Sequence, residues 1–141
     1  MSPLRRLRQD KFGAAAVEFA VVMPIFLVIL LGILVYGLYF SVAHAVQQLT
    51  AEAARATVPG LTNAERSSLA QKLVADAIGN YPFLMASKAT VNARVDTSDS
   101  SRFLVTIRYD ATHLGLQAFA PVLPVPPDTI EKTAVIRMGG F

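Results

Sequence analysis

An apolar run from Gly13 to Ala43 constrains this chain more than any other feature. Glu18 is the one charged residue within it. A helix of about thirty residues is about 45 Å long at ~1.5 Å per residue, whereas the hydrocarbon core of a bilayer is about 30 Å thick. A small domain built from the remaining residues has no interior that can surround such a helix. The run therefore predicts a helix that crosses a membrane.

Charge is distributed unevenly around this run. The residues before it include one acid, Asp10, and four basic residues, Arg5, Arg6, Arg8 and Lys11. Basic residues beside a first helix favour the cytoplasmic side, which predicts a cytoplasmic amino terminus and an exported remainder. After Ala43, nine basic and eight acidic residues are spread evenly. This balance provides no basic stripe, so we expect no nucleic-acid partner.

Residues that carry catalytic or metal chemistry are sparse. The chain has no cysteine, which removes disulfides, thiol chemistry and cysteine-based metal sites. His44 and His113 have no carboxylate at ligand spacing, so we expect no metal and no cofactor. No G-x-S-x-G elbow, phosphate-binding loop or H-E-x-x-H motif occurs. We therefore predict no catalytic residue and a protein that is not an enzyme.

A short motif marks the start of the apolar run. Gly13 is followed by Ala14, and then Glu18, Phe19 and Pro24 occur at fixed intervals. With basic residues before it and an apolar helix after it, the motif resembles a type IV prepilin signal. It is more similar to the G-x-x-x-x-E-F motif of TadE-like pseudopilins from tight-adherence (Tad, Flp) pilus systems. Ala14 departs from the wider type IV pilin pattern, which often has Phe at that place.

The resemblance implies a structural minor pilin or pseudopilin of a Tad-type pilus system. It implies cleavage between Gly13 and Ala14 by prepilin peptidase. Glu18 would then neutralise the new ammonium at Ala14, on its own or an adjacent subunit, while Phe19 belongs to the same processing and assembly motif. Further implied partners are other pilins and pseudopilins, the inner-membrane platform proteins and the lipid bilayer.

The same resemblance implies a place and a role. The protein is expected to cross the bacterial inner membrane once, with its carboxy-terminal domain in the periplasm, and to be incorporated into a pilus. The exported part is larger than the very short major pilins of Flp type. This difference favours a role in pilus initiation, at the tip or in assembly for surface adherence.

Three alternatives remain open at this stage. One is a pseudopilin of a type II secretion machine, for which Asp96–Asp99 offers a weak calcium-loop pattern. A second is a single-span anchored periplasmic binding module. A third is a secretory signal peptide cut after Ala45, although its apolar region of about 25 residues exceeds the usual 7–15. Processing at Gly13 separates the pseudopilin interpretations from the other two.

The chain divides by pattern into three parts. Residues 1–13 form the leader, expected to be flexible, residues 14–43 the transmembrane helix, and residues 44–141 the exported domain. Pro24 is expected to bend the transmembrane helix mildly. No breaker occurs before Pro59, so this helix should continue as a spine over 44–57, with an apolar stripe on one side.

The exported domain is predicted to be α+β and pilin-like. A capping box at Thr62 and Glu65 predicts a second helix over 62–79. Alternating apolar residues predict strands at about 89–96, 102–110 and 129–138, which form a small antiparallel sheet on the two helices. Residues 113–120 are expected to form a short apolar helix or loop, and the prolines after it an extended connector.

Overall fold

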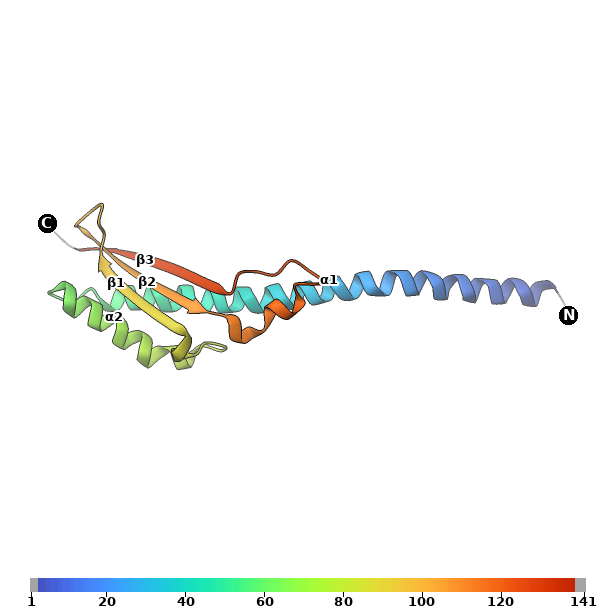
Figure 1. Ribbon diagram of the computed structural model, residues 1–141, viewed down its shortest axis with the longest axis horizontal. Helices are drawn as coiled ribbons and strands as arrows, with labels where there is room; N and C mark the ends of the chain where they lie inside the picture. The colour runs from blue at the N-terminus through green and yellow to red at the C-terminus, as the bar shows by residue number, and fades with distance from the viewer. Residues whose placement is uncertain (1–2, 139–141) are drawn as a thin grey trace.

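The computed structural model describes residues 3–138, and their side chains from Gly13 onward. Figure 1 shows one long helix with a small domain gathered along its carboxy-terminal half. The elements in chain order are α1 (Pro3–Ala56), α2 (Asn63–Ala77), β1 (Ala89–Val95), β2 (Arg102–Asp110) and β3 (Thr129–Arg137). Short 3-10 turns cover Ile78–Asn80, Ala86–Lys88, Thr112–Leu114 and Leu116–Phe119. The predicted α+β class is confirmed, with a long apolar first helix, a second helix and a three-stranded antiparallel sheet.

Helix α1 is longer than the pattern predicts, because it has 54 residues and begins at Pro3. The expectation of a flexible leader is wrong for the backbone from Pro3 onward. Proline is tolerated in the first turn of a helix, where its missing N–H has no intrahelical partner. No further breaker follows before Gly13. The leader and the apolar run therefore form one continuous helix.

The sheet has the strand order β1-β2-β3, and both pairs are antiparallel. Tyr109 on the central strand lies opposite Ala89 on one side and Ile130 on the other. Strands β1 and β2 are joined by the polar turn at 96–101, as expected for a hairpin. Side chains alternate between the two faces along each strand, so one face of the sheet carries the apolar residues.

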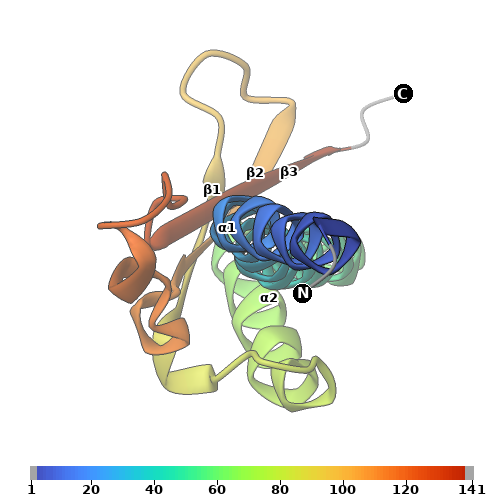
Figure 2. The same ribbon diagram turned by 90° about the vertical axis from the view of Figure 1, so that its right-hand side faces the viewer.

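Both helices lie against this apolar face, as the end-on view in Figure 2 shows. Helix α1 packs on β2 and β3, and α2 packs on α1 and β1. The centre of the core consists of side chains that are 0% exposed, from the central strand and the spine: Phe103, Val105, Ile107, Tyr109, Val46, Leu49 and Ala53. The predicted apolar stripe of the spine is thus the surface on which the sheet rests.

The predicted capping residues stabilise the start of α2. The Thr62 hydroxyl accepts the backbone N–H of Glu65 over 3.1 Å. The Glu65 carboxylate reaches back to the backbone N–H of Leu61 over 2.8 Å, one residue before the usual partner in a capping box. The helix ends at Ala77, two residues earlier than predicted, and continues as the 3-10 turn Ile78–Asn80.

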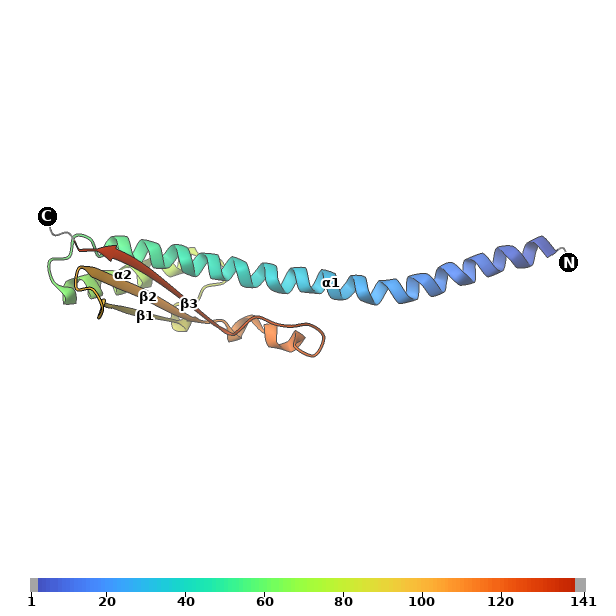
Figure 3. The same cartoon turned by 90° about the horizontal axis from the view of Figure 1, so that it is seen from above.

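The connector between β2 and β3 does not simply bridge the strands. It extends beyond the sheet and lies beside α1, toward the amino terminus (Figure 3). A second, smaller apolar cluster forms there from Val35 of α1 with Leu116 and Leu123 of the connector. The connector therefore covers a part of α1 that belongs to the predicted membrane helix.

Candidate functional site

The residues of the prepilin-like motif all lie on α1. From Gly13 to Leu30 every side chain is exposed, and none packs against another part of the described chain. These exposed side chains are almost entirely aliphatic or aromatic. Burying one of them is worth about 1.5–3 kcal/mol, which the isolated chain does not gain here. This part of α1 therefore needs an apolar environment supplied from outside the fold.

Glu18 is placed one helical turn after Ala14. Residues four apart on a helix lie on the same side, so the backbone nitrogen of Ala14 and the Glu18 carboxylate share one face. A shallow groove beside the carboxylate is lined by Ala15, Phe19 and Val22. No other residue from Gly13 to Ala43 is charged. The structure thus brings Ala14, Glu18 and Phe19 together on one short stretch of helix.

The residues predicted to orient the helix lie where the structure describes the backbone alone. Arg5, Arg6 and Arg8 lie on the described backbone of α1, as does Lys11, but their side chains lie outside the described part. Their role in orientation remains a prediction. Pro24 lies inside α1, which continues through it without interruption. The helix is curved along its length (Figure 3).

Gly13 has no packing role among the side chains that the structure describes. A methyl group added at its Cα meets no other atom within 4 Å, and the same holds for Gly32 and Gly37. Glycine inside a helix costs about 1 kcal/mol relative to alanine. Packing within the described residues therefore does not explain glycine at these positions.

Helix α1 is long and apolar enough to cross a membrane over Gly13–Ala56, and among the described residues it alone passes this test. Only 6% of its most apolar stretch is buried. A core helix of a soluble protein is mostly buried, so this explanation does not apply. The helix is compatible with a single-pass membrane anchor.

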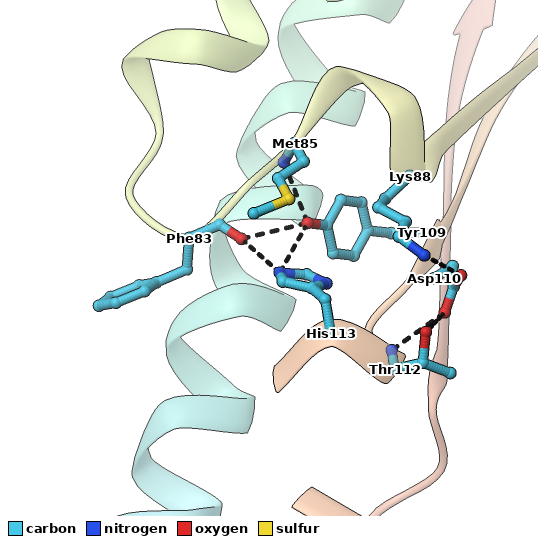
Figure 4. Close-up of polar contacts among 7 residues, drawn as sticks. All are labelled: Phe83, Met85, Lys88, Tyr109, Asp110, Thr112 and His113. Atoms are coloured by element: carbon cyan, nitrogen blue, oxygen red, sulfur yellow. Dashed lines mark hydrogen bonds and ion pairs between the residues drawn. The ribbon is translucent and has the colours of Figure 1, made fainter. Parts of the chain in front are cut away.

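A small cluster of polar contacts lies at the end of β2 (Figure 4). The buried Tyr109 hydroxyl accepts the backbone N–H of Met85 over 3.0 Å and donates to the carbonyl oxygen of Phe83 over 3.1 Å. The His113 Nε2 atom lies 3.2 Å from the same carbonyl oxygen. Burial raises the pKa of Tyr109, so the phenol stays protonated. The cluster holds the 83–85 loop against the sheet.

Asp110 lies beside this cluster and serves a structural purpose. One carboxylate oxygen accepts the backbone N–H and the hydroxyl of Thr112, and the other is 3.0 Å from the Lys88 ammonium. The Thr112 hydroxyl and N–H, followed by Lys88, hold the pKa of Asp110 well below its usual range. The contact with Lys88, 22 residues away in the chain, joins the end of β2 to the 3-10 turn Ala86–Lys88.

Asp96 and Asp99, the acids of the weak calcium-loop pattern, accept hydrogen bonds within the hairpin turn. Asp96 accepts the backbone N–H of Ser98, and Asp99 accepts the N–H and hydroxyl of Ser101. Within the described residues, no group of three or more potential metal-binding side chains is close enough to hold an ion. Sequence patterns missed the Tyr109–His113 cluster, for which the four-residue spacing of the two rings is the sole local signal.

These observations define a class of protein, in which one helix that is apolar enough to cross a membrane continues as the spine of a small α+β domain. The sequence model of the TadE-like protein family matches residues 13–55, so this stretch of the chain is similar to that family. The match covers the exposed apolar helix and the spine, and it does not extend over the rest of the α+β domain. No curated protein and no solved structure matches the chain.

Proposed function

We propose that this chain is a structural minor pilin or pseudopilin of a Tad-type pilus assembly system. One observation carries the proposal. The stretch from Gly13 to Leu30 has the TadE-like pattern and exposes an apolar surface that no other part of the described chain covers. Lipid, or apolar helices of neighbouring subunits, are the environments in which such a helix is stable. The helix acts first as an anchor and then as a packing element.

In this proposal the amino terminus faces the cytoplasm and the α+β domain lies outside the membrane. The basic residues before Gly13 support that orientation. Prepilin peptidase cleaves between Gly13 and Ala14. The surroundings of Gly13 support this step, because the glycine serves no packing purpose among the described side chains.

Cleavage gives Ala14 a free ammonium one turn from Glu18. A lone carboxylate or ammonium in an apolar environment costs a few kcal/mol, and pairing the two offsets much of this cost. The pair also favours one axial position of a helix against its neighbours. The partners in assembly are other pilins and pseudopilins and the inner-membrane platform proteins. A domain of this size favours initiation, tip or assembly over the bulk subunit.

The proposal is tested by determining the amino-terminal residue of the protein isolated from its own membranes. Ala14 as the new terminus is the expected result. A terminus at Val46 means a secreted domain released by signal peptidase, and it overturns the proposal. An uncleaved terminus at Met1 or Ser2 leaves a simple anchored protein and also overturns it.

A pair of variants separates recognition by the peptidase from damage to the helix. Gly13→Val should abolish processing, because a branched side chain next to the scissile bond obstructs a peptidase active site. Gly32→Val is the matched control, since a Cβ at either glycine meets nothing within the fold. The control protein should be processed normally. Processing of Gly13→Val at the normal rate contradicts recognition of this glycine.

A further inference from the structure

The connector between β2 and β3 is unusually apolar for a surface loop. From Leu114 to Pro127 it contains no charged residue, and Gln117 is its one side chain with a strong polar group. Val122 is 57% exposed, and Ala118, Ala120 and Pro121 are exposed beside it. Loops of soluble domains normally meet water with polar side chains. This segment, here called the apolar connector (114–127), has the composition of a surface that meets something other than water.

Ten of the fourteen residues of the apolar connector present no unpaired backbone N–H group. Four of its residues are prolines and have no N–H group to satisfy. Six further N–H groups donate to carbonyl oxygens three or four residues earlier, those of Leu114, Gly115, Ala118, Ala120, Val122 and Leu123. In hydrocarbon an unsatisfied backbone group costs several kcal/mol, so irregular chain is tolerated there only when its polar groups are paired.

The apolar connector lies at a defined height along α1. Its side chains pack on Val35 and, around it, on Leu31, Tyr36, Leu38 and Tyr39. Leu31 follows Ala14 by 17 residues, which is about 26 Å along the helix. A hydrocarbon core of about 30 Å that begins at Ala14 therefore ends slightly beyond Leu31. The connector reaches back to the level at which α1 leaves the hydrocarbon.

The free side of α1 at the same level is apolar as well. Ile33, Leu34 and Phe40 are all exposed. The connector and these side chains form one apolar surface that is continuous with the lipid-facing part of the helix. Tyr36 fixes the connector to the helix, because its hydroxyl donates to the carbonyl oxygen of Pro124 over 3.1 Å.

We propose that the apolar connector docks on the extracytoplasmic leaflet of the membrane that α1 crosses, with Val122 among the lipid chains next to the headgroups. The inference rests on the proposed function, because it requires α1 to span that membrane. Contact at a second place beside the helix limits the tilt of the domain and fixes its height above the bilayer.

The chain has no cysteine, so a single introduced cysteine can be labelled uniquely. The full-length protein carrying Val122→Cys and a solvent-sensitive fluorophore is reconstituted in vesicles of phosphatidylethanolamine and phosphatidylglycerol. Separate vesicles contain lipids with a nitroxide quencher near the headgroup or near the end of the acyl chain. Ser98→Cys, in the exposed β1–β2 turn, is the matched water-facing control, and Ile25→Cys reports on the membrane helix.

The Val122 label should show blue-shifted emission and stronger quenching by the nitroxide near the headgroup than by the deep one. The Ser98 label should show neither, and the Ile25 label should be quenched most by the deep nitroxide. If Ile25 is quenched but Val122 behaves like Ser98, the docking proposal is wrong and the membrane anchor stands. If Ile25 is not quenched, α1 does not span the bilayer and the proposed function fails with it.

A second copy of the chain is the competing occupant of this surface. Reconstitution at a tenfold lower protein-to-lipid ratio distinguishes the two. Contact with lipid leaves the emission and quenching of the Val122 label unchanged on dilution. Emission that is blue-shifted, unquenched by either nitroxide and lost on dilution assigns the apolar connector to contact between copies and overturns the proposal.

Discussion

The Tyr36 hydroxyl donates a hydrogen bond to the carbonyl oxygen of Pro124, and the two oxygen atoms are 3.1 Å apart. The bond joins residues 88 positions apart in the chain. It connects the membrane-proximal part of α1 to the proline-rich end of the apolar connector. The position of the connector therefore depends on a polar contact as well as on the apolar cluster at Val35.

Removing this hydroxyl tests how firmly the connector is held. Tyr36→Phe should cost about 0.5–1.5 kcal/mol, the usual net value of one hydrogen bond. The loss should be local, and hydrogen exchange should accelerate at the amides of Val122 and Leu123, which donate to the carbonyl oxygen of Phe119. Tyr39→Phe is the matched control, because the Tyr39 ring packs on the same clusters and its hydroxyl forms no hydrogen bond within the described residues. Equal exchange rates in both variants contradict an anchoring role for Tyr36.

The strands and the face that each of them buries were predictable, whereas the position of the connector was not. Alternation of apolar residues around Val91 and Ile107 is a local signal with a period of two, and one face must be buried. The contact between Tyr36 and Pro124 depends on how two distant segments are brought together by the sheet. No local pattern in either segment records it.

The contacts of charged side chains also depend on distant segments, which local patterns do not record. The three-residue spacing of Glu52 and Arg55 predicts a weak pair on one helix. In the structure the Glu52 carboxylate instead accepts the hydroxyl of Tyr81 over 2.9 Å, a partner 29 residues away. Arg55 is exposed. The packing of α2 on α1 decides this contact, so the sequence of one helix does not reveal it.

At the candidate site the motif residues were all predictable from sequence, because they lie within twelve consecutive positions. Their spacing on a helix places Ala14 and Glu18 on one face without any tertiary contact. The structure adds that no part of the described chain covers them. The cluster at Tyr109 was not predictable, since it depends on Phe83, a non-glycine residue with φ of 66°, which no turn motif in the sequence indicates.

Tyr109→Phe tests this cluster. The substitution leaves the Met85 N–H without its acceptor and the Phe83 carbonyl without one donor, which should destabilise the fold by about 1–3 kcal/mol. Urea unfolding of the full chain in detergent, followed by circular dichroism, measures the loss. Tyr39→Phe is again the control and should change stability little. Equal stability of the two variants contradicts a structural role for the Tyr109 hydroxyl.

The raised pKa of Tyr109 predicts how the stability of the fold changes at alkaline pH. Burial raises the pKa of Tyr109 in the folded state above 10.0, its ordinary value, and burial followed by the Glu52 carboxylate raises that of Tyr81. Above about pH 10 the unfolded chain therefore loses phenolic protons first, and stability falls as the pH rises through the folded values. The fall should be less steep in Tyr109→Phe. Identical slopes in the variant and the unaltered protein contradict this assignment.

Asp110 should stabilise the fold at neutral pH and lose this effect in acid, and Asp110→Asn tests this. The pKa of Asp110 is lowered in the folded state by Thr112 and then by Lys88, so its contribution is present above 3.8, the ordinary value, and is lost as the pH falls below it. The asparagine variant should be less stable than the unaltered protein near neutral pH. The difference in stability between the two proteins should narrow as the pH falls below 3.8. A gap that stays constant with pH contradicts the electrostatic part of the explanation.

Glu18→Gln is the sharpest test of the proposed assembly. The amide keeps the size of the side chain and removes its charge, so the ammonium at Ala14 has no carboxylate one turn away. Leaving that ammonium unpaired in an apolar environment should cost a few kcal/mol in each assembled subunit. Insertion should be unaffected, because a neutral side chain enters the bilayer more easily than a charged one. Val22→Ala, in the same groove beside Glu18, is the apolar control.

Three measurements on the same cells separate the steps: the membrane fraction of the protein, its amino-terminal residue, and its amount in sheared pili or in complexes with other pilins. Glu18→Gln should reach the membrane and be cleaved at Ala14, yet be depleted from pili or pilin complexes, whereas Val22→Ala should pass all three steps. Normal assembly of Glu18→Gln removes the charge pair from the mechanism and leaves apolar packing of α1 to hold the subunits together. Failure of both variants at assembly instead assigns the effect to the shape of the groove, because Val22 contributes no charge. The comparison therefore distinguishes electrostatic pairing from packing on one turn of helix.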